Sequence, residues 1–188
     1  MRTIFVIAAP TNGGKTTLMA RLMSMPGLDL HHVVTSNSRP PRPGEVNGKD
    51  YHFLTREEFQ AKIEAGEFVE WAHVHNDLKG VERRALENSC PDGGKILMQL
   101  DIQGYRTFKN TLPRDQYKIL GVFLEAPSFE VLLERWRKRD DKLDPVDVAA
   151  RTASFHKEMA GRHEFDHLVL NDDFEKCVSE VAEIIRLN

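Results

Sequence analysis

The chain contains only two cysteines, Cys90 and Cys177, among 188 residues. Two cysteines cannot form the disulfide framework of a small secreted protein, and they do not supply the paired thiolates of a structural zinc site. The sequence is therefore typical of a protein from a reducing compartment. We expect a cytoplasmic location.

Long apolar runs and an excess of positive charge are also missing. No segment approaches the roughly 18 apolar residues of a membrane span, and the start MRTIFVIAAP passes directly into a glycine-bearing loop, unlike a cleaved signal peptide. Lys and Arg number 26 against 29 Asp and Glu, so the chain has no global positive field that would recruit nucleic acid. We expect neither a membrane nor a nucleic acid among its partners.

What is present is the pattern of a packed α/β protein, with 40% hydrophobic and 29% charged residues. The run Thr3 to Ala9 is almost entirely apolar, which is typical of a strand buried on both faces of a parallel sheet. Later strands are predicted at 96–100, 119–124 and 167–170, and helices at 103–109, 129–139, 146–162 and 174–187. This alternation predicts a three-layer core, with a parallel sheet between helices.

The segment from 33 to 90 interrupts this alternation. Its prolines and glycines, in SRPPRPGEVNGKDYHF, exclude a helix there, and a helix at 56–65 and a strand at 68–74 follow. We interpret the chain as one domain with a core at 1–32 and 91–188 and an inserted lobe at 33–90. The charged run ERWRKRDDKLDP, from Glu134 to Pro145, is a second irregular region. It is either a solvated face or a lid at about 135–150.

The loop after the first strand carries a phosphate-binding motif. Ala9 to Thr16 matches GxxxxGK[ST] except that alanine replaces the first glycine, which is tolerable if φ of Ala9 is negative. Because the loop links a buried strand to a helix, its N–H groups can surround a phosphate chain, with Lys15 on the β and γ phosphates and Thr16 on magnesium. The expected ATP-binding residues here are Pro10, Thr11, Asn12, Gly13, Gly14, Lys15, Thr16 and Thr17.

The inserted lobe supplies a second set of polar residues. Arg39 and Arg42 lie in a proline-stiffened loop, and two forked guanidinium groups suit one phosphate monoester. Tyr51 can add a hydroxyl donor, and Glu70 follows in a predicted strand.

These segments resemble the guanylate kinase family. SRPPRPGEVNGKDYHF is followed by EEF, GEFVEWA, LDIQG and VLNDD in the family's order, so the similarity covers nearly the whole chain. The resemblance implies a P-loop NTPase-like core, a nucleoside monophosphate (NMP)-binding lobe at 33–90 and a lid. It also implies transfer of the γ-phosphoryl group of ATP to GMP or dGMP, with Mg²⁺.

The resemblance assigns roles residue by residue. Arg39, Arg42 and Tyr51 would bind the acceptor phosphate, while Glu70 and Thr35 would contact the guanine base. Asp101 would lie near the acceptor nucleoside and the magnesium, and Asn171 near the adenine. Such cation clustering suits phosphoryl transfer, in which catalysis is mostly positioning and charge neutralisation. Arg135 and Arg139 match lid arginines that would close on the ATP phosphates, and Arg151 matches one from the following helix that would bridge donor and acceptor.

Three departures from the family pattern concern the acceptor side. The common YGT or YGS segment reads Lys79-Gly80-Val81, so an ammonium replaces a tyrosine hydroxyl near the phosphate, and a valine replaces a hydroxyl donor to guanine O6. Gln99 replaces an aspartate of the LDID segment, which removes a negative charge near the magnesium.

Several alternatives stay open at this point. The acceptor could be a modified or different nucleoside monophosphate, as Val81 suggests. A non-catalytic guanylate-kinase-like binding module is a second alternative, although the set of phosphate-binding cations argues against it. A GTPase is disfavoured because no NKxD segment is present. A homodimer is compatible with the sequence.

Overall fold

A computed structural model describes residues 1–74, 76–137 and 145–188. The main sheet and its helices comprise β1 (Arg2–Ala8), α1 (Lys15–Met23), β2 (Leu30–His31), β7 (Lys95–Gln99), α4 (Ile102–Thr111), β8 (Tyr117–Glu125), α5 (Phe129–Arg137), α6 (Pro145–Ala160), a 3₁₀ turn (Arg162–Glu164), β9 (His167–Leu170) and α7 (Phe174–Leu187). The inserted lobe comprises β3 (Ser36–Asn37), β4 (His52–Phe53), α2 (Arg56–Glu64), β5 (Phe68–Val74), β6 (Asp77–Glu82) and α3 (Arg83–Glu87).

The main sheet has the strand order β2-β7-β1-β8-β9, and each of its neighbouring pairs is parallel. β1 lies at its centre, which explains why this strand is apolar on both faces. Successive side chains of a strand point to opposite faces. Phe5 and Ile7 accordingly pack with α1 and α7, while Ile4 and Val6 pack with α4.

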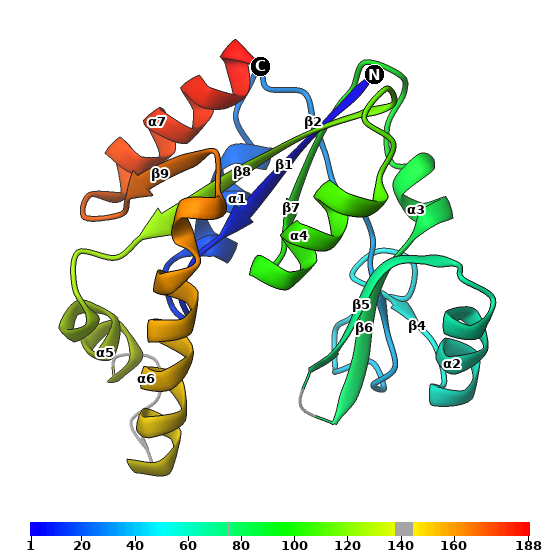
Figure 1. Ribbon diagram of the computed structural model, residues 1–188, viewed down its shortest axis with the longest axis horizontal. Helices are drawn as coiled ribbons and strands as arrows, with labels where there is room; N and C mark the ends of the chain where they lie inside the picture. Colours follow the sequence, from blue (N-terminus) through cyan, green and yellow to red (C-terminus); the bar gives the residue numbers. More distant parts are fainter. Residues whose placement is uncertain (75, 138–144) are drawn as a thin grey trace.

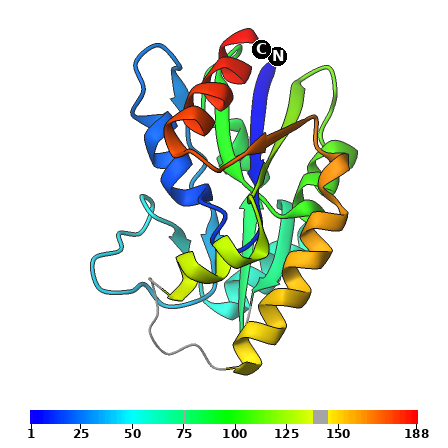
Figure 2. The ribbon, with the colours of Figure 1, turned by 90° about the vertical axis from the view of Figure 1, so that its left-hand side faces the viewer.

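Helices cover both faces of this sheet (Figures 1 and 2). α1 and α7 lie on one side, and α4 lies on the other. α7 buries Val178, Val181 and Ile185 against the sheet, at the spacing of an amphipathic helix. The predicted three-layer α/β core is therefore confirmed.

The lobe forms a separate four-stranded sheet, in the order β4-β3-β6-β5. In the view of Figure 1 it lies below the main sheet, on the side opposite α5 and α6. A capping box begins α2: the Thr55 hydroxyl accepts from the Glu58 amide, and the Glu58 carboxylate accepts from the Thr55 amide. Glu82 ties the sheet to this helix because it accepts from both Ser36 and Lys62.

The predicted elements 68–74, 167–170 and 174–187 have the bounds of β5, β9 and α7. The sequence pattern did not predict β6, because the glycine in DLKGVE weakens a strand pattern, nor α3, which has only five residues. It also missed β2, β3 and β4, which have two residues each and are too short to carry a periodicity. No helix in the described ranges is both long and apolar enough to cross a bilayer.

Candidate functional site

The phosphate loop joins β1 to α1 with two residues of positive φ, Asn12 at 62° and Gly14 at 92°. The Gly13 amide donates to the Pro10 carbonyl over 2.8 Å, which closes the turn. α1 begins at Lys15, so its free N–H groups face the loop. A cavity of about 220 Å³ lies here, lined by Asn12, Gly13, Gly14, Lys15, Thr16, Thr17 and Arg135.

Ala9 meets the condition that the sequence sets for it. Among the described non-glycine residues, positive φ values occur only at Asn12 and Asp29, so Ala9 has an ordinary backbone conformation. Its Cβ lies 2.7 Å from where a Cβ on Gly13 would be. The alanine is therefore tolerated only because position 13 has no side chain.

Lys15 folds back over its own loop. Its Nζ donates to the carbonyl of Ala9 and, over 3.4 Å, to that of Pro10. Burial lowers the pKa of Lys15, while the carboxylates of Glu158 and Asp101 raise it. The ammonium is thus partly desolvated, which strengthens its attraction to a phosphate.

Asn171 follows β9 and holds the loop from behind. Its side-chain Nδ2 donates to the Gly13 carbonyl over 2.9 Å, and its backbone carbonyl accepts from Nη2 of Arg135 over 3.0 Å. Nδ2 also lies 2.6 Å from where a Cβ on Gly14 would be, so a side chain at position 14 would collide with it. The sequence assigns Asn171 to the adenine. Its side chain here braces the phosphate loop.

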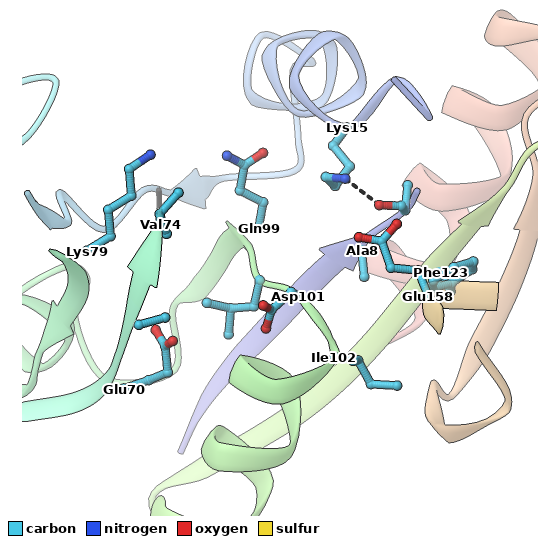
Figure 3. A pocket seen from close by; sticks show the side chains of 13 residues that line it. Ala8, Lys15, Glu70, Val74, Lys79, Gln99, Asp101, Ile102, Phe123 and Glu158 are labelled. Carbon is cyan, nitrogen blue, oxygen red and sulfur yellow. Dashed lines mark hydrogen bonds between the residues drawn. The ribbon is translucent and has the colours of Figure 1, made fainter. Parts of the chain in front are cut away.

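A central cavity of about 250 Å³ lies between the phosphate loop and the lobe (Figure 3). Lys15 and Glu158 line it on the core side, and Glu70 and Lys79 on the lobe side. Gln99 lies between the two lysines in this view. The cavity therefore brings Lys15 of the predicted ATP loop together with Glu70 and Lys79 of the predicted acceptor site, whereas Arg39 and Arg42 do not line it.

Asp101 also lines this cavity, at the carboxyl end of β7. It caps α4, because its Oδ1 accepts from the Gly104 amide over 2.8 Å. Its second carboxylate oxygen is not used in this cap.

A second cavity of about 170 Å³ continues into the lobe, lined in part by Thr35, Asp50, Tyr51 and Val81. It shares four residues with the central cavity: Glu70, Lys79, Gln99 and Leu100. Glu70 and Val81 are direct partners across β5 and β6, and Val81 is 1% exposed. Beside the Glu70 carboxylate, the neighbouring strand β6 therefore presents the methyl groups of Val81 to the pocket, and no hydroxyl.

Glu70 is poised for a change of protonation. Burial, with the nearby charge of Asp101, raises its pKa to about 7. A carboxyl group in this state gains from any ligand that donates hydrogen bonds to its ionised form.

A group of cations surrounds Tyr51. The Arg39 guanidinium lies 5.3 Å from the Tyr51 ring centre and the Lys79 Nζ lies 5.6 Å from it. Burial lowers the pKa of Lys79, and the charges of Arg39 and Arg42 lower it further. These positive groups repel one another until an anion binds between them.

The residues present fit a magnesium ion bound with nucleotide. Thr16 offers a hydroxyl in the first turn of α1, and Asp101 and Glu158 offer carboxylate oxygens at the central cavity. In the described part of the chain no three His, Cys, Asp or Glu side chains cluster tightly enough to hold a metal by themselves. Magnesium needs no such cage, since one or two carboxylates usually hold it together with phosphate oxygens.

Two acidic residues of this region were not predicted from the sequence. Glu158 lies in α6, two helical turns after Arg151, a spacing that could have indicated it. Glu45 lies three residues after Arg42, and its carboxylate binds Arg39. Of the expected lid residues, Arg135 lies in the last turn of α5 beside Asn171, Arg151 lies in α6, and Arg139 falls outside the described residues. Of the expected lid at about 135–150, residues 138–144 also fall outside them, and the rest belongs to the end of α5 and the start of α6.

Comparison with known proteins agrees with this geometry. The family model for guanylate kinase matches residues 1–188. The chain is 39% identical to the guanylate kinase of Idiomarina loihiensis, covering 97% of this chain and 85% of that protein. It is 40% identical to that of Corynebacterium diphtheriae, covering 97% and 93%.

The crystal structure of guanylate kinase from Anaplasma phagocytophilum is similar to this one, with a TM-score of 0.74 at 28% identity over 98% of this chain and 85% of that one. The match runs along the whole length of the chain, and the phosphate loop and the pocket that contains Glu70 are both present. The chain belongs to the guanylate kinase family.

Proposed function

We propose that the protein transfers the γ-phosphoryl group of ATP to GMP or dGMP, giving ADP and GDP or dGDP. The observation that carries this proposal is the pair of adjoining cavities that share Glu70, Lys79, Gln99 and Leu100. One cavity contains the phosphate-loop lysine and the other contains the base pocket. A γ-phosphoryl group and an acceptor phosphate can therefore meet where the two cavities join.

On the donor side, the loop from Pro10 to Thr17 binds the ATP phosphates with backbone N–H groups and the N-terminus of α1. Lys15 exchanges its contacts with the Ala9 and Pro10 carbonyls for the β and γ phosphate oxygens. Asn171 fixes the Gly13 peptide, so the loop keeps its shape while Lys15 moves. Arg135 lies beside the phosphate loop and adds a further positive charge.

On the acceptor side, Glu70 accepts hydrogen bonds from the guanine N1–H and amino group, and Thr35 adds a hydroxyl. Arg39, Arg42, Lys79 and Tyr51 bind the phosphate. The lysine here does the work that a tyrosine hydroxyl does in the family pattern. It supplies a full charge in place of one hydroxyl donor.

Magnesium, held by Thr16 and by Asp101 with the phosphate oxygens, would neutralise charge on the β and γ phosphates. The chain's own residues do the rest: they hold the two phosphates in line and exclude water from the space between them. We propose that Arg139 binds the ATP phosphates and that Arg151 bridges the donor and acceptor phosphates.

The remaining assignments rest on the sequence. We place the enzyme in the cytoplasm because its two cysteines are both free and buried and its substrates are nucleotides. A homodimer is compatible with the reaction, which needs residues of one chain only.

A coupled assay of ADP release tests the proposal, with ATP, magnesium and each ribo- and deoxyribonucleoside monophosphate in turn. We expect GMP and dGMP to be the preferred acceptors. Release of ADP with none of the monophosphates, while ATP still binds, would support a binding module. A strong preference for a nucleotide that lacks O6 would mean that the pocket serves another acceptor.

A further inference from the structure

Arg39, the proposed anchor of the acceptor phosphate, is already engaged in the structure. Its Nη1 donates to Oε2 of Glu45 and its Nη2 donates to Oε1, each over 2.6 Å. The two groups are largely buried, with side-chain exposures of 13% and 20%. This is the bidentate geometry in which an arginine and a carboxylate fit best.

The pair leaves a defined part of the guanidinium free. Nη1 gives its second hydrogen to the Pro40 carbonyl over 2.9 Å, so both Nη1 hydrogens are used. Nη2 keeps one hydrogen, and Nε keeps its own; neither makes a hydrogen bond to any described residue. A guanidinium has five donors, and these two lie side by side on one edge. That edge is a second bidentate fork, which matches two oxygens of a phosphate.

Two further contacts fix this orientation. The guanidinium lies against the rings of Tyr51 and Phe53, at 5.3 and 5.5 Å from their centres. Glu45 also accepts from the backbone amide of Arg42 over 2.7 Å, so one carboxylate holds both acceptor arginines in register. The hydrogen bonds from Arg39 and Arg42 lower the pKa of Glu45 to about 2, and the carboxylate therefore stays ionised at any pH at which the enzyme works.

We propose that Glu45 is a positioning residue for the acceptor: it turns the end of the Arg39 guanidinium away, so that the Nε and Nη2 edge is presented to the phosphate of the nucleoside monophosphate. This inference rests on the proposed function. Tyr51 connects the pair to the acceptor cavity, because it lines that cavity while its ring contacts Arg39. Glu45 acts through Arg39 and does not itself touch the substrate.

The alternative interpretation is that Glu45 occupies the site of the acceptor phosphate and must move away before the acceptor binds. The Arg42 amide argues against it, since its hydrogen bond holds the Glu45 carboxylate to the loop without any contribution from Arg39. The two interpretations predict opposite effects on the affinity for the acceptor. Removal of the charge weakens acceptor binding if Glu45 positions Arg39, and strengthens it if Glu45 competes with the phosphate.

The test is calorimetric titration of GMP into the Glu45→Gln variant without ATP, with KM values for GMP and ATP measured beside it. A carboxamide keeps the size but loses one acceptor oxygen, so we expect GMP affinity to fall roughly tenfold, as for the loss of one charge-assisted contact. The KM of ATP should stay unchanged. Glu164→Gln is the matched control, because Glu164 forms a similar bidentate pair with Arg106 between the 3₁₀ turn and α4 of the core.

A double-mutant cycle then separates positioning from general stability. In an Arg39→Ala background, Glu45→Gln should cost little further GMP affinity, because its partner is already gone. An unchanged or tighter GMP affinity in Glu45→Gln would overturn the inference, as would an equal rise in both KM values or a full additional loss in the Arg39→Ala background. Failure of the proposed function looks different, since the wild-type protein would then not phosphorylate GMP.

Discussion

The donor side and the acceptor side of the site are built from different chemical groups. The donor side is mainly backbone: a loop closed by its own carbonyls, the start of α1, and one lysine folded over them. The acceptor side is mainly side chains, carried on a small sheet and held by pairs such as Arg39 with Glu45. A site built from backbone groups depends on the geometry of the chain, so its sequence motif is retained. A site built from side chains can be altered one residue at a time.

The distribution of departures from the family pattern follows this difference. On the donor side, only Ala9 departs, and its methyl group fits because Gly13 makes room for it. On the acceptor side, Lys79, Val81 and Gln99 depart, and all three line the pocket where a base and a phosphate would lie. Substrate choice is therefore more open to change in this protein than the use of ATP.

The largest effect should come from the donor side. Lys15→Ala removes the ammonium from the β and γ phosphates, and we expect kcat to fall roughly 10²- to 10³-fold, as for the loss of one group that stabilises transition-state charge. Turnover by the coupled assay measures it. Lys176→Ala, an exposed lysine on α7, is the control, and unchanged turnover in Lys15→Ala would contradict the proposed mechanism.

Glu70→Gln should lower kcat/KM for GMP by about 10²-fold, because the amide cannot accept from both base donors. The wild-type carboxyl, with its pKa near 7, must be ionised to accept. Below pH 7 we therefore expect kcat/KM for GMP to fall about tenfold per pH unit, and this limb should vanish in the variant. A pH profile measures both.

The same substitution should stabilise the fold at alkaline pH. A folded pKa of about 7, above the ordinary 4.5, means that the protonated carboxyl favours the folded state, and that this contribution is lost as the pH rises through 7. Glu70→Gln should thus gain roughly 1 to 3 kcal/mol at pH 8 and little at pH 4. Denaturant unfolding at the two pH values measures it, and equal gains would place the carboxyl in water.

Arg39→Ala and Arg42→Ala should sharpen the division between the two sides. Each removes a charge-assisted contact to the acceptor phosphate, so we expect the KM of GMP to rise roughly ten- to hundredfold. The KM of ATP should change little. Arg106→Ala is the control, because Arg106 pairs with Glu164 on the core and not with any predicted acceptor residue. Equal effects on both substrates would show that Arg39 and Arg42 serve the donor as well.

Val81→Thr should give the smallest effect. The hydroxyl would restore a donor beside guanine O6 at nearly constant volume, and we expect kcat/KM for GMP to rise up to about tenfold for one neutral hydrogen bond. Val69→Thr is the control, because Val69 is buried to a similar degree and lines neither cavity. Loss of GMP activity in Val81→Thr would mean that the pocket is adapted to another base.

The sequence by itself determined the parts that depend on neighbours along the chain. The apolar run of β1 followed by GGKT fixes a buried strand, a phosphate loop and a helix, since local turn chemistry and burial are written in consecutive residues. The amphipathic spacing of α7 and the alternation of strands and helices determined the three layers. The acceptor residues were named from the order of their motifs, without their geometry.

Only the tertiary structure decided which distant groups meet. Asn171 reaches the Gly13 carbonyl 158 positions earlier in the chain, and Glu158 comes to share a cavity with Glu70. The raised pKa of Glu70 likewise depends on burial of its side chain in the cavity between lobe and core and on the charge of Asp101, which follows β7. Desolvation and side-chain pairing are properties of the packed fold, so no local pattern of residues encodes them.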